Sequence, residues 1–234
     1  MRQDCTTATL FLTGMQRSGT TLLDKLLAGH PRLSVLSQPF PLLFVEAKRS
    51  FLRTLGERDA SYPLGDLFLE TRYRPRDLAA HLAAQRLDGT ALAPLFAVME
   101  SFSGQYTRFA PARTAEVLAG LEPGDLAAVA AQIYRALAHR PGAILTGGKE
   151  TTCEELLPYL LDRGYRCLLV LRDPRDVLAS LAHGEGRRHG GRLKPTLFNL
   201  RQWRKSVAFA LHLEDHPGCL WLRYEDLAAR PAET

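Results

Sequence analysis

The stretch FLTGMQRSGTTLLDKLLAGHP, residues 11–31, decides the fold. Its first residues are a short apolar run with β-forming side chains that stops at Gly14. Leucines then recur at helical spacing over residues 22–27, and Gly29 followed by Pro31 marks the end of that helix. The pattern predicts a buried strand, a loop of small and polar residues, and a helix. Backbone N–H groups and the positive end of the helix dipole converge at such a loop, so it predicts an anion site.

The loop nearly matches the phosphate loop of nucleoside triphosphatases, G-x-x-x-x-G-K-[ST]. Gly14 and Gly19 have the required spacing, but Thr20 occupies the position of the lysine that reaches the terminal phosphates. Arg17 lies within the loop instead, where its guanidinium can neutralise a bound anion. The cation is therefore relocated, and the loop favours an anion other than a magnesium-bound triphosphate.

The rest of the chain alternates strand and helix patterns, which is typical of a parallel α/β sheet. Short apolar runs predict strands at 9–13, 33–36, 143–146, 167–171 and 219–222. Residues 46–140 are rich in alanine and leucine at helical spacing and predict a helical insertion. We expect a three-layer, P-loop-like parallel sheet flanked by helices, in a single domain over residues 1–234. The last residues, ARPAET, look like the first turn of another helix, so we expect a truncated C-terminus.

The amino-acid composition and charge indicate a globular protein with an anionic partner. The 234 residues are 46% hydrophobic and 24% charged, as in an ordinary globular domain, and the net charge of +5 indicates a polyanionic partner. Nucleic acid is disfavoured because the basic residues form no long run and only 8% of residues are aromatic. The four cysteines form no C-x-x-C pair, which predicts reduced thiols and no metal site. With no signal-peptide pattern and no membrane-spanning run, we expect a cytoplasmic protein.

Four segments resemble sulfotransferases that use 3′-phosphoadenosine 5′-phosphosulfate (PAPS). GMQRSGTT, residues 14–21, resembles the family's 5′-phosphosulfate loop, and LRDPRDVLAS, residues 171–180, resembles its 3′-phosphate site. YEDL, residues 224–227, resembles a segment whose tyrosine lies against the adenine, and Lys149 takes the place of a lysine that helps to bind the sulfuryl group. The resemblance implies these PAPS-binding residues: Gln16, Arg17, Ser18, Gly19, Thr20, Thr21, Arg172, Ser180 and Tyr224.

The resemblance implies in-line transfer of a sulfuryl group to a hydroxyl or amine, with no metal, on a small-molecule, carbohydrate or lipid acceptor. Arg17 and Lys149 would neutralise charge on the transferred group. At the expected positions of the general base this sequence differs from the family, because Gln38 and Thr151 stand where members carry a glutamate or a histidine. An amide cannot accept the proton. Glu150 is our candidate for this catalytic role, with Glu46 and the more distant His183 as alternatives.

Three other interpretations compete with this one. The missing lysine disfavours a phosphate-loop kinase. Nucleic-acid binding is disfavoured because PAPS, itself a polyanion, already accounts for the net positive charge of the chain. A non-catalytic PAPS-fold binding protein is motivated by Gln38 and Thr151. The basic, glycine-rich segment GEGRRHGGRLKP, residues 184–195, fits either a flap over the anionic ligand or an exposed loop.

Overall fold

A computed structural model describes residues 8–57, 63–65, 72–183 and 195–234. The strands are β1 (Ala8–Gly14), β2 (Leu33–Ser37), β3 (Leu145–Lys149), β4 (Arg166–Leu171) and β5 (Cys219–Arg223). The helices are α1 (Thr20–Gly29), α2 (Pro41–Thr54), α3 (Pro75–Ala84), α4 (Gly89–Met99), α5 (Pro111–Ala119), α6 (Leu126–Leu137), α7 (Leu157–Asp162), α8 (Pro174–His183), α9 (Thr196–His212) and α10 (Tyr224–Ala229). Short 3₁₀ helices are η1 (Pro63–Gly65) and η2 (Glu154–Leu156).

The strands form one sheet in the order β2-β3-β1-β4-β5, and every neighbouring pair is parallel. The predicted α/β class, with a parallel sheet between helical layers, is therefore confirmed. Because all strands run the same way, their carboxyl ends meet at one edge, where parallel α/β proteins bind ligands. The central strand β1 carries the predicted anion loop to the middle of that edge. Helices α2 to α6 lie between β2 and β3 along the chain.

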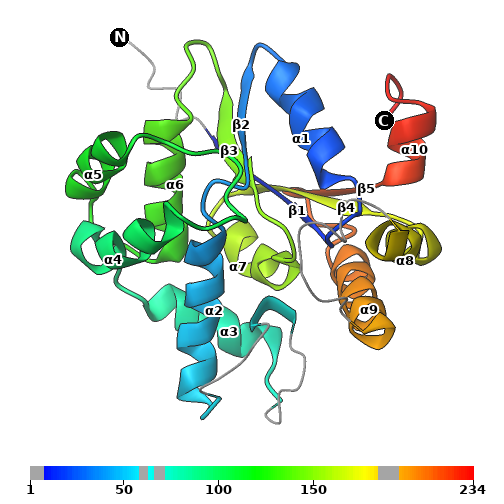
Figure 1. The fold of residues 1–234 in the computed structure, drawn as a ribbon, viewed down its shortest axis with the longest axis horizontal. Helices are drawn as coiled ribbons and strands as arrows, with labels where there is room; N and C mark the ends of the chain where they lie inside the picture. Colours follow the sequence, from blue (N-terminus) through cyan, green and yellow to red (C-terminus); the bar gives the residue numbers. More distant parts are fainter. Residues whose placement is uncertain (1–7, 58–62, 66–71, 184–194) are drawn as a thin grey trace.

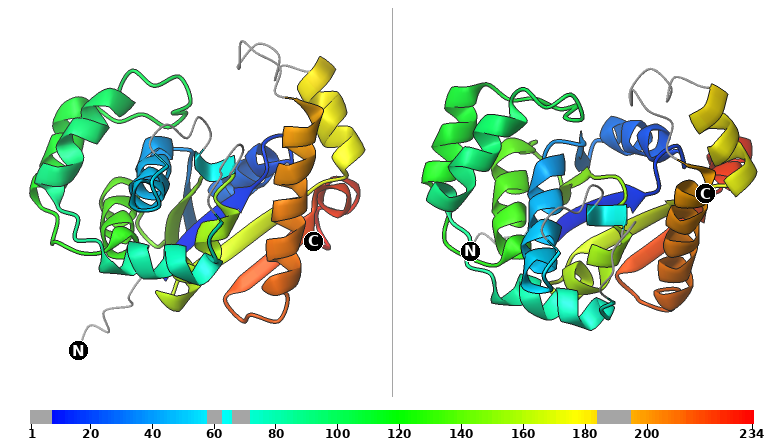
Figure 2. Two further views of the ribbon diagram at one scale, coloured as in Figure 1. Left: turned by 90° about the horizontal axis from the view of Figure 1, so that it is seen from below. Right: turned by 60° about the horizontal axis from the view of Figure 1, so that its bottom comes forward.

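Helices cover both faces of the sheet. In Figure 1, α1 and α10 lie on one side and α6, α7 and α9 on the other, and Figure 2 shows the same layers from two further directions. Helices on both sides of the sheet bury strand β1, whose successive side chains point to opposite faces. Phe11 belongs to the large core beneath α2, α6 and α7, whereas Leu12 packs with Leu23 of α1 and Leu227 of α10.

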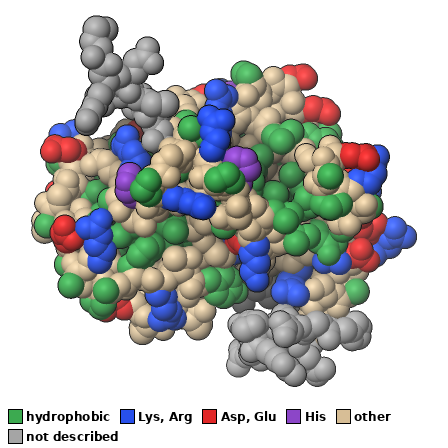
Figure 3. Space-filling view, turned by 90° about the horizontal axis from the view of Figure 1, so that it is seen from above, with side chains coloured by type: hydrophobic (Ala, Val, Ile, Leu, Met, Phe, Trp, Pro, Cys, Tyr) green, Lys and Arg blue, Asp and Glu red, His purple; other side chains and the backbone are tan. Residues whose placement is uncertain are grey.

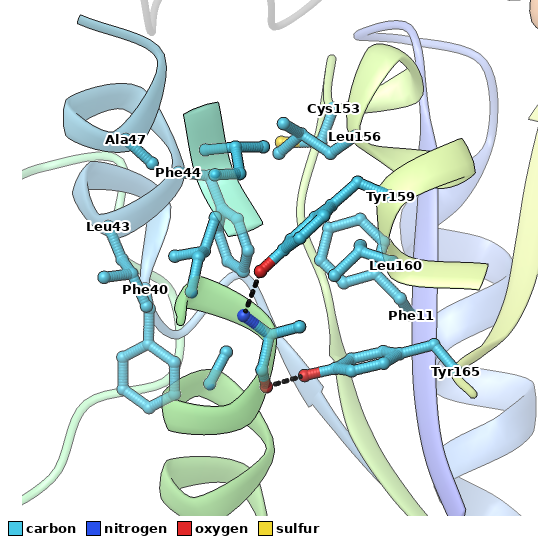
Figure 4. Close-up of a cluster of buried hydrophobic side chains, with 14 of the residues drawn as sticks. Phe11, Phe40, Leu43, Phe44, Ala47, Cys153, Leu156, Tyr159, Leu160 and Tyr165 are labelled. Atoms are coloured by element: carbon cyan, nitrogen blue, oxygen red, sulfur yellow. Dashed lines mark hydrogen bonds between the residues drawn. The ribbon is translucent and has the colours of Figure 1, made fainter. Parts of the chain in front are cut away.

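The large core also contains hydrogen bonds that fix α6 on α7. The Tyr159 hydroxyl accepts a hydrogen bond from the Ala127 N–H at 2.9 Å, and the Tyr165 hydroxyl donates to the Ala127 carbonyl at 2.7 Å. Figure 4 shows both phenol rings pointing toward α6 from the α7 side of the core. The N–H lies in the first turn of α6 and has no partner within the helix, so Tyr159 satisfies a group that would otherwise be buried without one.

The position of β3 corrects one prediction. The strand spans Leu145–Lys149 rather than 143–146, so Lys149 is its last residue instead of part of the following loop. Gly147 and Gly148 hid the strand, since glycine is depleted in strands. A Cβ at Gly147 would lie 1.8 Å from the Leu10 carbonyl oxygen, and one at Gly148 would lie 2.6 Å from the Tyr134 ring. The glycines allow β3 to lie against its neighbours.

No helix among the described residues is long and apolar enough to cross a membrane.

Candidate functional site

The loop between β1 and α1 has an unusual backbone conformation that leaves the start of α1 without a side-chain cap. Arg17 has φ 69° and Gly19 has φ 99°, both in the left-handed region, and Gly19 caps α1 without a side-chain hydrogen bond. The first N–H groups of α1 therefore keep their capacity to bind a ligand. Ser18 is buried and donates its hydroxyl hydrogen to the Met15 carbonyl at 2.7 Å, which fixes the turn. Gln16 and Thr21 are exposed beside it, and Thr20 is buried.

Two segments that are distant in sequence meet at this loop. The Arg17 Nε–H donates to the Ser180 hydroxyl at 2.9 Å, and the Arg172 guanidinium donates to the Arg17 carbonyl at 3.2 Å. The guanidinium carbon of Arg172 lies 4.3 Å from the centre of the Tyr224 ring, a cation–π contact. The same ring covers Gly19, where a Cβ would lie 2.3 Å from it. The structure thus brings together Arg17, Arg172, Ser180 and Tyr224.

The start of α8 explains how Arg172 and Ser180 reach the loop. Asp173 precedes Pro174 and accepts a hydrogen bond from the Arg175 N–H at 2.8 Å, as an N-cap does. The Arg175 guanidinium beside the Asp173 carboxylate lowers the pKa of Asp173 to about 2. Trp203 of α9 donates its indole N–H to the Arg172 carbonyl at 2.9 Å and holds the end of β4. The Arg172 Nε is buried without a partner, a donor that an anion would satisfy.

Lys149 lies at the same edge, at the end of β3. The next residues bind the start of the loop, since the Glu150 N–H donates to the Leu12 carbonyl and the Thr152 N–H to the Gly14 carbonyl, both at 2.9 Å. The Lys149 side chain is 1% exposed, and its Nζ lies 3.7 Å from an Asp24 carboxylate oxygen. Burial lowers the pKa of Lys149, while the nearby Asp24 and Glu150 carboxyl groups oppose that change.

Gln38 contacts Lys149 with the oxygen of its amide. The Gln38 Oε1 accepts hydrogen bonds from Lys149 Nζ at 3.5 Å and from the Thr151 hydroxyl at 3.4 Å. Its Nε2 donates to the Gly104 carbonyl at 2.7 Å. Gln38 and Thr151, the two residues that the resemblance places at the base positions, are therefore hydrogen-bonded to each other, and neither is a carboxylate or an imidazole.

The connection between α4 and α5 covers this cluster. The Tyr106 N–H donates to the Gln38 carbonyl at 3.2 Å and the Thr107 N–H to the Ser37 carbonyl at 2.9 Å, which extends β2 by backbone pairing. The Tyr106 ring lies 5.1 Å from Lys149 Nζ and is 56% exposed. The only non-glycine residues with positive φ in the described chain are Arg17, Gln38 and Thr152, and all three border this edge. Backbone strain of this kind concentrates at functional sites.

Glu150 lies in the interior beside this cluster. Its Oε1 accepts a hydrogen bond from the Phe40 N–H at 2.7 Å, its Oε2 has no partner, and the residue is 1% exposed. Burial raises the pKa of Glu150 to about 8, against the opposing influence of the Phe40 N–H and Lys149. These contacts favour an anchoring role for Glu150 over that of a general base.

The other two candidates for the general base, Glu46 and His183, gain no support from the structure. Glu46 lies on α2 and forms ion pairs with Arg49 and Arg53, which is the arrangement of a solvated helix residue. The His183 side chain and the basic segment 184–194 lie outside the described residues. Sequence reasoning missed Asp24, which looked like one polar residue among the leucines of α1. Its position three residues after Thr21, on the face turned toward β2 and β3, is the signal that was available.

Other surfaces of the protein are weaker candidates for a functional site. A groove of about 240 Å³ lined by Leu10, Leu27, Leu33, Leu168 and Leu220 lies at the amino ends of the strands, at the opposite edge from Arg17. Lys and Arg side chains are scattered over the face in Figure 3 and do not form one patch there. Within the described ranges, no cluster of three or more His, Cys, Asp or Glu residues could hold a metal ion.

Comparison with known proteins gives the class of this chain. The family model described as "Sulfotransferase family" matches residues 9–234, so the chain belongs to the sulfotransferase family.

Three solved structures are similar to it. A sulfotransferase domain from the curacin biosynthetic pathway is 22% identical with a TM-score of 0.48, and the match covers 96% of this chain and 69% of that one. A sulfotransferase domain from the olefin synthase of Synechococcus PCC 7002 is 18% identical with the same score and coverage. TT1252 from Thermus thermophilus is 16% identical with a TM-score of 0.37, over 92% of this chain and 88% of that one. A comparison with curated proteins gives no match.

Proposed function

We propose that this chain transfers a sulfuryl group from PAPS to a hydroxyl or amine of an acceptor and releases adenosine 3′,5′-bisphosphate. The observation that carries the proposal is the meeting of Arg17, Ser180, Arg172 and Tyr224 around the anion loop. Three features support it: the N–H groups at the start of α1 would bind a 5′-anion, Arg172 and Ser180 would bind a second anion, and the Tyr224 ring, which contacts both Gly19 and Arg172, would offer an aromatic face. A nucleotide with phosphates on both its 3′ and 5′ positions needs all three.

Each part of the donor has a proposed binding group. The N–H groups of the loop from Gln16 to Thr21 would bind the 5′-phosphosulfate at the start of α1. Arg172, with its unpartnered Nε, and Ser180 would bind the 3′-phosphate and thereby discriminate PAPS from ATP. Tyr224, whose ring lies against both Gly19 and Arg172, would support the adenine.

Transfer would depend on positioning and charge neutralisation. The bond from sulfur to the acceptor oxygen or nitrogen forms as the bond to the 5′-phosphate oxygen breaks, and that phosphate leaves with the electron pair. The proton that the acceptor loses passes to solvent water on the side of the exposed Tyr106. By analogy with phosphoryl transfer, the charge spreads over the peripheral oxygens, where cations lower the barrier. Arg17 would act on the bridging and leaving oxygens, and Lys149 on the sulfuryl oxygens. These two cations would supply the charge that magnesium supplies to nucleoside triphosphates.

Glu150 would act by anchoring the segment after β2. Its bond to the Phe40 N–H fixes the chain that carries Gln38, and Gln38 in turn contacts Lys149. The acceptor would approach from the side of Tyr106, the exposed ring that lies over Lys149. A small molecule, a carbohydrate and a lipid all offer a suitable hydroxyl. A cytoplasmic location is part of the proposal, since Cys153, Cys167 and Cys219 are free thiols.

A second candidate, a protein that binds the donor without transferring the sulfuryl group, is favoured by the pairing of Gln38 with Thr151 where a base is expected. Binding and turnover separate the two functions. Binding is measured by thermal unfolding with adenosine 3′,5′-bisphosphate or with ATP and magnesium. Ligand at ~100 times its dissociation constant adds about 2.7 kcal/mol of stability. Stabilisation by ATP with magnesium alone would refute both functions, and Arg172→Ala and Ser180→Ala should each weaken the bisphosphate effect.

Turnover is measured with PAPS carrying radioactive sulfur and a panel of phenols, alcohols, sugars and amines. Arg17→Ala should reduce transfer by about 100-fold or more because it removes the cation proposed to act on the leaving oxygen. Gln38→Ala should leave measurable transfer because the amide takes no proton. Bisphosphate binding without transfer to any acceptor would identify a binding protein. Loss of transfer in Gln38→Ala together with full activity in Arg17→Ala would overturn the assignment of Arg17.

A further inference from the structure

Asp24 and Lys149 form a buried pair of opposite charges beside the anion loop. Asp24 comes from α1 and is 2% exposed, and Lys149 ends β3 and is 1% exposed. The Asp24 Oδ2 accepts the Ser37 hydroxyl hydrogen at 2.6 Å, which fixes the carboxylate from the side of β2. Three elements that meet only in the folded chain therefore build this pair: α1, β2 and β3.

The contacts of Lys149 are long for a buried ammonium group. They are 3.7 Å to Asp24, 3.5 Å to Gln38 and 5.1 Å to the centre of the Tyr106 ring. A second buried pair in the protein is different, since Lys48 Nζ lies 2.7 Å from a Glu155 oxygen. The Lys149 ammonium is kept near its counter-charge while its N–H groups stay able to bind another acceptor.

Asp24 is the main source of negative charge facing Lys149. The groups around the ammonium are Asp24 on α1, Glu150 next to it on the chain, the uncharged Gln38 after β2 and the Tyr106 ring from the α4–α5 connection. Burial raises the pKa of Glu150 to about 8, so that carboxyl group is mostly neutral at pH 7. Asp24 therefore compensates most of the cost of burying the ammonium.

We propose that Asp24 is a positioning residue for sulfuryl transfer, whose carboxylate keeps Lys149 protonated and directs its ammonium group toward the anion loop. The inference rests on the proposed function, because Lys149 acts there on the sulfuryl oxygens. Burial lowers the pKa of Lys149 and the Asp24 charge opposes this, so removal of the charge lowers that pKa further. A neutral lysine gives no charge stabilisation, and activity must then fall at a lower pH than in the wild type.

The direct test follows the protonation of Lys149 by NMR. The chain has five lysines, so protein with ¹³C-labelled lysine gives few Cε signals, and Lys149→Gln assigns the one of interest. Asp24→Asn should move the midpoint of the Lys149 titration to lower pH. Asp24→Glu, which keeps the charge, and Ser37→Ala, which removes only the hydroxyl partner, should leave it near the wild-type value. Repeating the titration in a Glu150→Gln background removes the second carboxyl group from the comparison.

The kinetic test uses the same variants. With Asp24→Asn the falling limb of the kcat profile should move to lower pH, and kcat at pH 9 should drop roughly tenfold relative to wild type. KM for PAPS and stabilisation by adenosine 3′,5′-bisphosphate should change less than about twofold, since Arg172 and Ser180 are untouched.

An unmoved Lys149 midpoint in folded Asp24→Asn overturns the inference, and so does an Asp24→Glu profile that shifts as far as that of Asp24→Asn. A moved midpoint with an unmoved kcat profile overturns the role in transfer. If the wild type transfers no sulfuryl group, the proposed function fails, whereas the NMR titration still decides whether Asp24 controls the protonation of Lys149.

Discussion

Replacing Glu150 by glutamine should make the protein more stable, by an amount that grows with pH. Glu150 is 1% exposed, accepts one hydrogen bond from the Phe40 N–H and leaves its second oxygen without a partner. Burial raises its pKa from the ordinary 4.5 to about 8. The folded protein therefore retains this proton up to about pH 8, whereas the unfolded chain releases it near pH 4.5.

The sign of the effect follows from proton binding. Between these two pH values the folded state binds more protons than the unfolded state, so stability falls as pH rises. The 2.5 pH units from 4.5 to 7, at about 1.36 kcal/mol per unit, correspond to a loss of about 3 kcal/mol at pH 7. Glutamine is neutral throughout and its side-chain oxygen can still accept the Phe40 N–H. The Glu150→Gln variant therefore avoids the loss.

The assay is urea unfolding followed by circular dichroism at pH 5, 6, 7 and 8. The difference in unfolding free energy between Glu150→Gln and wild type should rise by about 1.4 kcal/mol for each pH unit up to 7. Glu46→Gln is the matched control, because Glu46 pairs with Arg53 at the surface and should change stability by less than about 1 kcal/mol at any pH. A Glu150→Gln difference that stays constant from pH 5 to 8 would refute the reasoning.

Three further predictions concern the backbone and the loop cation. Gly147→Ala should destabilise the protein by about 3 kcal/mol or more, because the new Cβ would lie 1.8 Å from a main-chain oxygen of β1. The control, Gly29→Ala, should be tolerated because a Cβ there has nothing within 4 Å. Equal urea midpoints for the two variants would contradict this prediction. Gly19→Ala should weaken binding of adenosine 3′,5′-bisphosphate at least tenfold in calorimetry, since its Cβ would displace the Tyr224 ring. The double variant with Tyr224→Ala should bind the bisphosphate no more weakly than Gly19→Ala alone. Arg17→Ala should reduce kcat by about 100-fold or more while the protein stays folded, and an unchanged kcat would remove Arg17 from the transfer step.

Much of the fold was predictable because its signals are local. The apolar run before Gly14 and the leucines after Thr21 define a strand and a helix by their periods alone. The start of α8 was equally clear, because Asp173 at the N-cap, Pro174 at the first helical position and Asp176 in the first turn are all residue types preferred there. The end of β3 was not predictable, because Gly147 and Gly148 have low strand propensity and are required there only by the neighbouring main chain and Tyr134.

The residues of the candidate site also fall into those that local sequence predicted and those that it did not. The sequence by itself predicted an anion loop with Arg17 in place of the usual lysine, and the family resemblance added a second motif with Arg172 and Ser180, since each is a short run of residues. Only the tertiary structure decided that these motifs touch, that Glu150 faces the interior, and that Asp24 lies beside Lys149. The physical reason is that burial and charge pairing depend on which strands are neighbours, and the order β2-β3-β1-β4-β5 brings together residues far apart along the chain.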